Sequence, residues 1–513
     1  MKKSLSLIAV TIIGLSLLVI LTHYFSAMFQ PVRWPTRIYF VLMFVVAAFC
    51  RPRLAIATFI FFLPLLPDLH IQLEGLLKPA VKYFVAHPAL DAVAGLTLGL
   101  WTRRLFVSRR LTSLFEAPHW LFGLLLLMLS ASTVTAVIRN IGDANLGIFD
   151  ADFFLRQLIG FKLLNRGNDY LPIVDLITYA FAVLTISLLC TFFKSLPPEE
   201  REAAIIKPIL FSVLISALWG IMQSITSYGL SQDTVNYRLS SLGWGAHGFQ
   251  PDLHAFASVM LVGTVGLLGF MKKFKGRYVH LAYLTIGLCW FALILSKSKA
   301  SLVLAVISSL VMLIFVSRQN GVQLKKIWYL LLGLVLSLAM LLLWSKNLTW
   351  VTTIGSFVLS PEVWDFEHFN RIFVHRPELF RAAWFIFVKY PLFGVGQGNF
   401  LSRSFDYELT QSTYLVAYQG DNAHNYFLQT LAETGLVGAL TFAAVLSRPY
   451  FNTKQKNSLF PATIAIYSIF LGNLFSHSLL VRPNLIWLAV FIALLYSYMG
   501  RCQGKVTLSS KGQ

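Results

Sequence analysis

Long apolar runs recur along this chain and constrain its fold more than any other feature. A helix crosses the hydrocarbon core of a bilayer with about 17–25 residues. Fourteen runs approach or exceed that length, at residues 5–29, 36–50, 54–67, 88–101, 118–138, 171–193, 205–228, 252–271, 279–296, 300–317, 328–345, 426–446, 460–480 and 484–499. Some of these runs are short, so we expect an all-α polytopic membrane protein with about 12–14 transmembrane helices.

Composition supports the same class of protein. Hydrophobic residues make up 57% and charged residues 12% of the 513 residues, whereas a soluble domain has about 25% charged residues. The first apolar run is longer than the roughly 7–15-residue core of a secretory signal, and no clean small-residue cleavage site follows it. We therefore expect residues 5–29 to form an uncleaved first helix.

The polar connections between the runs carry their charge asymmetrically. If the helices alternate in direction and Lys2 and Lys3 lie inside, the inner connections hold 24 of the 42 basic residues and four acidic residues. The outer connections then hold 18 basic and 18 acidic residues, so the formal net charge of +20 falls on one face. Basic clusters in short loops mark the cytoplasmic side of a membrane protein. The excess is thus a topology signal, and nucleic-acid binding is not needed to explain it.

One polar connection is far longer than the others. Residues 346–425 form an insertion on the predicted outer face, between transmembrane helices in residues 1–345 and C-terminal transmembrane helices with a short inner tail in residues 426–513. Loops of this size are usually functional or carry structure of their own. Within the insertion, residues 375–391 have helical spacing, with Pro377 suited to a first turn and Pro391 ending the run. We expect a large, partly helical outer loop.

The chain has four cysteines, and their positions do not indicate disulfide bonds. Three fall within apolar helices and one within the predicted inner tail, so none is placed to pair in an oxidising compartment. They are Cys50, Cys190, Cys289 and Cys502.

A glycine-rich stretch, "LFGVGQGNF", follows the helical part of the insertion. Its alternating Gly394, Gly396 and Gly398 allow a backbone to approach a ligand closely and to direct N–H groups at an anion. No Gly-Lys-Ser/Thr follows, so the stretch is not a nucleotide-binding Walker loop. A plain tight turn and an anion cradle both remain open.

The end of the insertion places ionisable groups where polar sequence gives way to an apolar run. His424 and Asn425 lie at that boundary, and Glu433 lies about two and a half turns deeper. A charged residue inside a membrane helix costs roughly 2.5–3.5 kcal/mol on insertion scales and is usually paired or functional. For Glu433, a structural hydrogen bond and a role in positioning a catalytic residue both remain open. His424 is either a helix-capping surface histidine or a general base, since a free imidazole titrates near 6.5.

Three cations on the predicted outer face are candidates for binding an anion. Arg238 precedes the run at 252–271, Lys299 lies at the start of the run at 300–317, and Arg376 opens the helical part of the insertion. A cation at a helix start opposes the helix dipole, so another partner is expected to hold Arg376. The other outer histidines, His247, His254 and His477, are read as structural.

Two adjacent blocks resemble a known family. "RPELFRAAWFIFVKYPLFGVGQGNF" followed by "AHNYFLQTLAETGLVGAL" resembles the O-antigen ligase / O-antigen polymerase superfamily of bacterial membrane glycosyltransferases, which shares an arginine-led helix, a glycine turn and a His-Asn block. The close match covers roughly residues 370–440, and a looser match extends upstream through Arg238, His254 and Ser298. Where the family usually has Ser-Arg, this chain has Ser298 and Lys299, and lysine lacks the bidentate fork that suits a phosphate.

The resemblance implies a reaction and a location. Such enzymes transfer a glycan from an undecaprenyl diphosphate carrier to a hydroxyl on the periplasmic face of the bacterial inner membrane, without metal or other cofactor. The implied partners are this donor, a lipid A-core or growing glycan acceptor, and membrane lipids, but no nucleic acid. By the same resemblance, His424 and Glu433 are assigned to catalysis and Asn425 to support. The diphosphate ligands would be Arg238, Lys299, Arg376, Gly394, Gly396 and Gly398.

Several functions within and outside the superfamily remain open. A ligase, which transfers a whole glycan to lipid A-core, is favoured by the strength of the glycine and His-Asn blocks. A polymerase of O-antigen or exopolysaccharide is a close second, and a protein O-oligosaccharyltransferase is a third branch. A polysaccharide transporter is disfavoured because, apart from Glu433, the spans are nearly free of charged residues.

Overall fold

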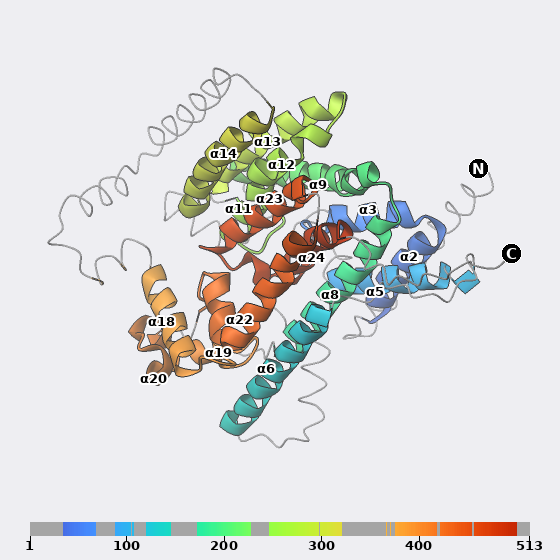
Figure 1. The fold of residues 1–513 in the computed structure, drawn as a ribbon. Coiled ribbons are helices and arrows are strands. Elements are labelled where there is room, and N and C mark those ends of the chain that lie inside the picture. Colours follow the sequence, from blue (N-terminus) through green and yellow to red (C-terminus); the bar gives the residue numbers. More distant parts are fainter. Residues whose placement is uncertain are drawn as a thin grey trace, which may run out of the picture.

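The computed structural model describes residues 34–67, 88–103, 105–106, 120–144, 172–226, 246–296, 298–320, 366, 370, 375–417, 421–453 and 456–499. Regular structure in these ranges is helical throughout (Figure 1). The α-helices are α2 (Trp34–Cys50), α3 (Pro52–Phe62), α5 (Pro88–Arg103), α6 (Trp120–Ala144), α8 (Pro172–Lys194), α9 (Pro198–Thr226), α11 (Leu253–Leu261), α12 (Leu267–Phe270), α13 (Arg277–Ser296), α14 (Lys299–Asn320), α18 (Arg376–Lys389), α19 (Phe400–Ser404), α20 (Tyr407–Thr410), α21 (Thr413–Ala417), α22 (Tyr426–Asn452), α23 (Lys456–Asn473) and α24 (Arg482–Ser497). A π-helical segment, η3 (Val262–Gly266), joins α11 to α12, and short 3-10 turns form η4 (Met271–Lys273) and η6 (Ser478–Leu480).

The predicted class, an all-α polytopic membrane protein, is confirmed. Among the described residues, six helices are long and apolar enough to cross a membrane, and five shorter apolar helices accompany them. Twelve of the fourteen predicted runs coincide with helices. The runs at 5–29 and 328–345 lie outside the described residues, so the total of 12–14 stays a prediction.

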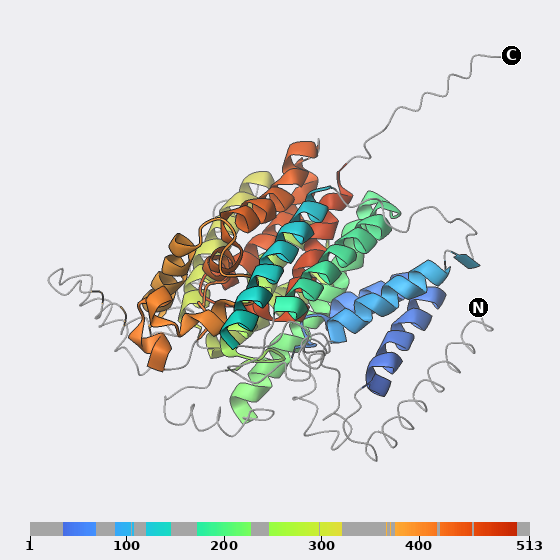
Figure 2. The same cartoon turned by 90° about the horizontal axis from the view of Figure 1, so that it is seen from below.

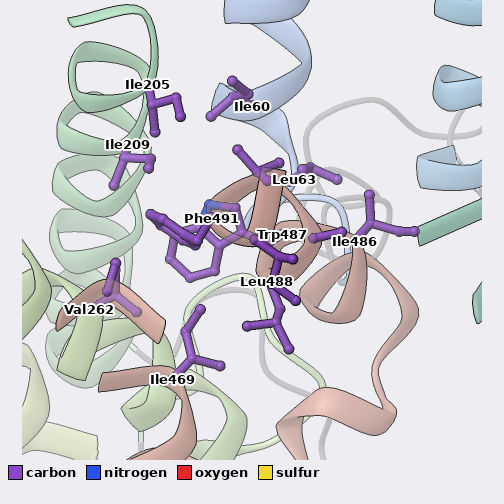
Figure 3. Packing of buried hydrophobic residues seen from close by; sticks show 14 of the residues in the cluster. Ile60, Leu63, Ile205, Ile209, Val262, Ile469, Ile486, Trp487, Leu488 and Phe491 are labelled. Atoms are coloured by element: carbon purple, nitrogen blue, oxygen red, sulfur yellow. The ribbon is translucent and has the colours of Figure 1, made fainter. Parts of the chain in front are cut away.

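Helix α24 is the central helix of the bundle. Every residue from Pro483 to Ser497 is buried, and α24 packs along α8 and against α23 and α5. In Figure 3, Trp487 and Phe491 of α24 are surrounded by aliphatic side chains from other segments, among them Ile60, Leu63, Ile205, Ile209, Val262 and Ile469. A helix that is apolar all round is buried among other helices, so α24 has no face left for lipid. Its start, at Arg482, is thereby fixed within the bundle.

The two ends of the bundle carry different groups. One end gathers residues of the predicted inner connections, and the contacts that join them are Arg53 Nη1 to Glu200 Oε2 at 3.3 Å, Lys273 Nζ to Glu202 Oε2 at 2.8 Å and Arg201 Nη1 to Ser497 O at 2.9 Å. The other end gathers the opposite ends of the same helices, with Arg482 3.7 Å from Asp175. Residues that the charge pattern assigns to one face therefore lie together. Figure 2 shows α2 and α5 paired at the edge of this bundle.

The described part of the predicted large loop is partly helical. Helix α18 covers most of the predicted helical stretch, with Pro377 in its first turn, and the short helices α19, α20 and α21 follow it. Figure 1 shows α18, α19 and α20 grouped beside α22, and α18 and α19 both contact α22.

Helix α22 is not continuous, in contrast to the single helix predicted at 426–446. Gly435 lies at φ 65° and ψ −169°, which breaks the helix. In an unbroken helix the N–H groups of Leu436 and Val437 would donate to the carbonyls four residues earlier. Here they donate instead to Pro391 O at 2.8 Å and Leu392 O at 3.2 Å.

The carbonyls released by this break are taken up by the glycine-rich turn. Ala432 O accepts from Val395 N at 2.9 Å, and Glu433 O accepts from Gly396 N at 2.9 Å. Two helical hydrogen bonds are thus replaced by four bonds to residues 391–396. The turn is inserted into the helix, and the outer loop is fixed to the bundle at this point.

Close approach of the two backbones requires glycine on both sides. A Cβ added to Gly394 would lie 2.3 Å from the backbone of Glu433, and one added to Gly435 would lie 2.3 Å from the backbone of Leu392. Both glycines also have positive φ, at 67° and 65°, a region that other residues rarely adopt.

We expect Gly435→Ala to lower the thermal unfolding midpoint of the detergent-purified protein. A left-handed conformation costs an L-residue roughly 1–2 kcal/mol, and the collision with Leu392 adds to that cost. Gly287→Ala, in helix α13, is the matched control and should not lower the midpoint. A Cβ at this position meets no heavy atom within 4 Å, and alanine is more favourable than glycine within a helix by up to about 1 kcal/mol. Equal midpoints for the two variants would contradict the described junction.

Candidate functional site

Arg376 is the first residue of α18, and its guanidinium is held by two uncharged acceptors. Nη1 donates to Phe475 O at 2.8 Å, in the loop between α23 and α24. Nη2 donates to His254 Nε2 at 2.8 Å, in the first turn of α11. The preceding residue, His375, is left-handed at φ 59° and is held by Glu378 Oε2 at 3.3 Å and by stacking on Tyr414. The start of α18 is therefore fixed, and Arg376 with it.

The charge of Arg376 is not matched by a carboxylate among the described residues, since no described Asp or Glu forms an ion pair with it. Burial lowers the pKa of the guanidinium, and the charge of Asp252 opposes this effect. The helix dipole of α18 is also unfavourable for a cation at this position. Arg376 is thus a partly buried cation whose hydrogen-bond partners leave its charge free to attract an anion.

His254 is held as a neutral acceptor for Arg376. Its other ring nitrogen, Nδ1, lies 3.2 Å from Ser298 Oγ. A guanidinium has only donors, so Nε2 of His254 must accept the hydrogen bond from Arg376. The ring proton of the neutral imidazole then lies on Nδ1 and points at Ser298 Oγ. Asp252 fixes the backbone here, because it caps α11 and accepts from His254 N at 2.7 Å.

His424 lies beside this histidine, directly before α22. Its ring packs edge-on against the rings of His254 and His477, with centroid distances of 6.1 Å and 4.9 Å. His424 Nε2 is 3.5 Å from Asp421 Oδ2, while Nδ1 is buried and has no hydrogen-bond partner among the described residues. The helix cap is Asn425, whose side chain accepts from Phe427 N and Leu428 N. The helix-capping reading of His424 is therefore wrong.

Two carboxylates keep their charge beside these histidines. Burial alone would raise the pKa of Asp252, but a hydrogen bond and the charge of His477, 3.5 Å away, hold it well below its usual range. The pKa of Asp421 is likewise lowered, because His424 outweighs the effect of burial. Conversely, burial alone would lower the pKa of His477, but the hydrogen bond and charge of Asp252 raise it.

Together these groups form what we call the outer cluster: Asp252, His254, Arg376, Asp421, His424 and His477. It lies at the end of the bundle opposite to the basic connections and draws on four separate segments. An imidazole beside a carboxylate can accept a proton, and a buried guanidinium can hold an anion. Among the described residues, no group of three or more His, Cys, Asp and Glu side chains has an arrangement that could hold a metal ion.

The three glycines of the turn direct their N–H groups at acceptors within the protein. Gly394 N donates to Tyr390 O, Gly396 N to Glu433 O, and Gly398 N to Glu433 Oε2 at 3.1 Å. The turn does surround an acceptor, but that acceptor is the carboxyl group of Glu433, which is 2% exposed. The geometry favours the tight-turn reading for the glycines and a hydrogen-bonded structural setting for Glu433. Among the described residues, neither forms a hydrogen bond with Arg376 or His424.

The predicted site residues fall into three groups. Arg376 and His424 come together, with Asn425 beside them, whereas Gly394, Gly396, Gly398 and Glu433 form a separate junction. Lys299 begins α14 directly after Ser298, so its backbone is next to the outer cluster, but its side chain lies outside the described part. Arg238 lies outside the described residues.

Four members of the outer cluster were not predicted from the sequence. They are Asp252, His254, Asp421 and His477. A signal for three of them is present, because "PDLH" and "DNAH" repeat an aspartate followed within three residues by a histidine, each immediately before an apolar helix. His477 has no such local pattern.

Comparison with known proteins bears on this site. Residues 284–443 match the family model described as O-antigen ligase. This stretch, about a third of the chain, is therefore similar to that family. That match contains Lys299, Arg376, the glycine turn, His424 and Glu433, while Asp252 and His254 precede it. The predicted superfamily is confirmed, and the family is one of membrane glycosyltransferases of the ligase and polymerase type. No curated protein matches the chain.

The ion pair between Asp252 and His477 predicts a pH dependence of the stability of this protein. The raised pKa of His477 contributes stability that is complete below its unfolded value, near 6.5, and is lost as pH rises through the folded value. The lowered pKa of Asp252 contributes stability that is complete above its unfolded value, near 3.9. Asp252→Asn, which can still cap α11, should therefore lower the unfolding midpoint more at pH 5.5 than at pH 8.5. A difference that does not change with pH would contradict the ion pair.

Proposed function

We propose that this protein is an O-antigen ligase that acts on the periplasmic face of the bacterial inner membrane. It transfers a glycan from an undecaprenyl diphosphate carrier to a hydroxyl of lipid A-core. His424 is the general base, and Arg376 binds the diphosphate together with Arg238 and Lys299. The match of residues 284–443 to the O-antigen ligase family supports the reaction class.

The observation that carries this proposal is the setting of Arg376. Among the described residues, this partly buried guanidinium hydrogen-bonds only to His254 and Phe475 O, and neither of these acceptors neutralises its charge. Charge-assisted, bidentate hydrogen bonds make phosphate a preferred partner of arginine. A diphosphate would supply the missing negative charge near His424, whose ring lies 6.1 Å from that of His254.

The reaction follows from this arrangement. His424 accepts the proton of the acceptor hydroxyl as its oxygen bonds to the anomeric carbon of the glycan. The bond from that carbon to the diphosphate breaks, and the electron pair leaves with the diphosphate, whose charge Arg376 compensates. Asp421, 3.5 Å from His424 Nε2, stabilises the imidazolium that forms. A positioned base of this kind contributes about 10²–10⁴-fold in rate.

The surroundings of the outer cluster suit a lipid-linked donor. Apolar side chains are exposed on α18 and the turn after it, with Trp384 49%, Val388 56% and Leu392 59% exposed. On α22, beyond the inserted turn, Leu440 is 59% exposed. Apolar surface that continues from a spanning helix onto an outer helix belongs in lipid or at its interface. A carrier can thus keep its polyprenyl tail in the membrane while its diphosphate reaches Arg376.

Purified protein should transfer glycan from the lipid-linked donor to lipid A-core in detergent, where no transmembrane gradient exists to drive transport. His424→Ala should lower the turnover by about 10²–10⁴-fold, and Arg376→Ala should also lower it severely. Arg381→Ala is the matched control and should leave turnover unchanged. Arg381 is an exposed arginine of the same helix, and it stacks on Phe366 and Phe385. Normal turnover by His424→Ala with unchanged folding would remove the base assignment.

A deletion strain should separate a ligase from a polymerase. If the protein is a ligase, complete lipid-linked polymer should accumulate while the lipopolysaccharide carries a bare core. Analysis of both fractions by gel electrophoresis measures this outcome. Single repeat units capping the core would instead identify a polymerase and overturn the choice of acceptor.

A further inference from the structure

We propose that Gln429 and Glu433 are positioning residues that hold His424 in place through a buried hydrogen-bond chain. The proposal rests on the proposed function, because it explains how that reaction's base is fixed. It gives Glu433 and the glycine turn a role in the reaction although neither touches the outer cluster directly.

This series of hydrogen bonds begins at Ala423, the residue before His424. The backbone N–H of Ala423 donates to Gln429 Oε1 at 3.2 Å, and Gln429 Nε2 donates to Glu433 Oε1 at 3.1 Å. All three residues are buried, with Gln429 4% and Glu433 2% exposed. A buried amide that uses both its acceptor and its donor in this way has one orientation, so it transmits position from one end to the other.

Glu433 is the fixed end of this chain. Its carboxylate also accepts from Gly398 N at 3.1 Å and from Phe400 N at 3.2 Å. Its backbone carbonyl accepts from Gly396 N and from Ser132 Oγ of α6 at 3.1 Å. The turn and two spanning helices therefore determine where Glu433 lies.

His424 needs such support because its own contacts do not hold it. It is left-handed at φ 49°, a conformation that costs a non-glycine residue energy and persists only where the surroundings enforce it. Its Nδ1 has no described partner, and Nε2 has one at 3.5 Å. The flanking backbone must then fix the ring, through the Asn425 cap on one side and the bond from Ala423 to Gln429 on the other.

The sharpest test exchanges donor and acceptor within the pair. Gln429→Glu keeps an acceptor for Ala423 N but places two carboxylates against each other, so the link to Glu433 is lost. Adding Glu433→Gln restores a donor opposite the carboxylate introduced at position 429 and removes the extra charge, although one N–H of the turn loses its acceptor. Gln429→Glu should lower kcat by about 10²-fold, the cost of a misplaced catalytic group, with KM for the carrier unchanged, and the double variant should recover most of the loss.

Two controls separate positioning from folding. Glu408→Gln, at an exposed glutamate of α20, removes a charge without a described contact of its side chain and should leave kcat unchanged. Gln429→Met, similar in length and uncharged, replaces Gln429→Glu if that variant does not fold. It should also lower kcat, and normal kcat in a folded Gln429 variant would overturn the proposal.

A readout that does not need activity distinguishes this proposal from the proposed function. The rate at which diethyl pyrocarbonate modifies His424, measured by mass spectrometry, should change in Gln429→Glu and return in the double variant. In a His424→Ala background, Gln429→Glu should cause no further loss of turnover. An active His424→Ala protein would sink the proposed function, whereas an unchanged modification rate in Gln429→Glu would sink only the positioning role.

Discussion

In a membrane-spanning helix, every backbone N–H and C=O group that loses its helical partner must find another one within the protein. Helix α22 meets this requirement by exchange, since the groups freed at Gly435 bond to residues 391–396. Because the turn can reach them only through glycine, the break and the turn depend on each other. The outer loop is thereby joined to the bundle by main-chain bonds, which no surface side chain could replace.

The loop between α23 and α24 performs a similar task on the other side of the outer cluster. Its carbonyls at Phe475 and Ser476 accept from Arg376 Nη1 and from Tyr426 N, respectively, so α18 and α22 are both tied to it. The loop is fixed in turn by α24, which is buried from Pro483 to its end. A guanidinium without a carboxylate would normally move toward water, and these attachments keep Arg376 against His254 instead.

Periodicity and length predicted most of the fold, because a lipid-facing helix needs the same apolar run wherever it lies. The starts of α18 and α22 followed from local pattern too, because a proline in the first turn and an asparagine at the N-cap mark helix starts. The break at Gly435 could not be predicted, because a glycine in an apolar run looks the same whether its helix bends or not. The alternating glycines left a tight turn and an anion cradle both open, because Glu433, whose carboxyl group accepts from Gly398 N, lies 35 residues later in sequence. His477 reaches Asp252 only through the tertiary fold.

In the proposed reaction, the charges of the outer cluster give a reason for placing the base and the anion site together. Among the described residues, Asp252 lies 3.5 Å from His477 and Asp421 lies 3.5 Å from His424, whereas no carboxylate forms an ion pair with Arg376. In the reaction proposed above, negative charge develops on the diphosphate as a proton arrives on His424. Each new charge stabilises the other across a site partly shielded from water, where charge interactions are stronger than in solution. A base placed far from the leaving group would gain nothing from this coupling, so the proposed reaction requires His424 to lie near Arg376.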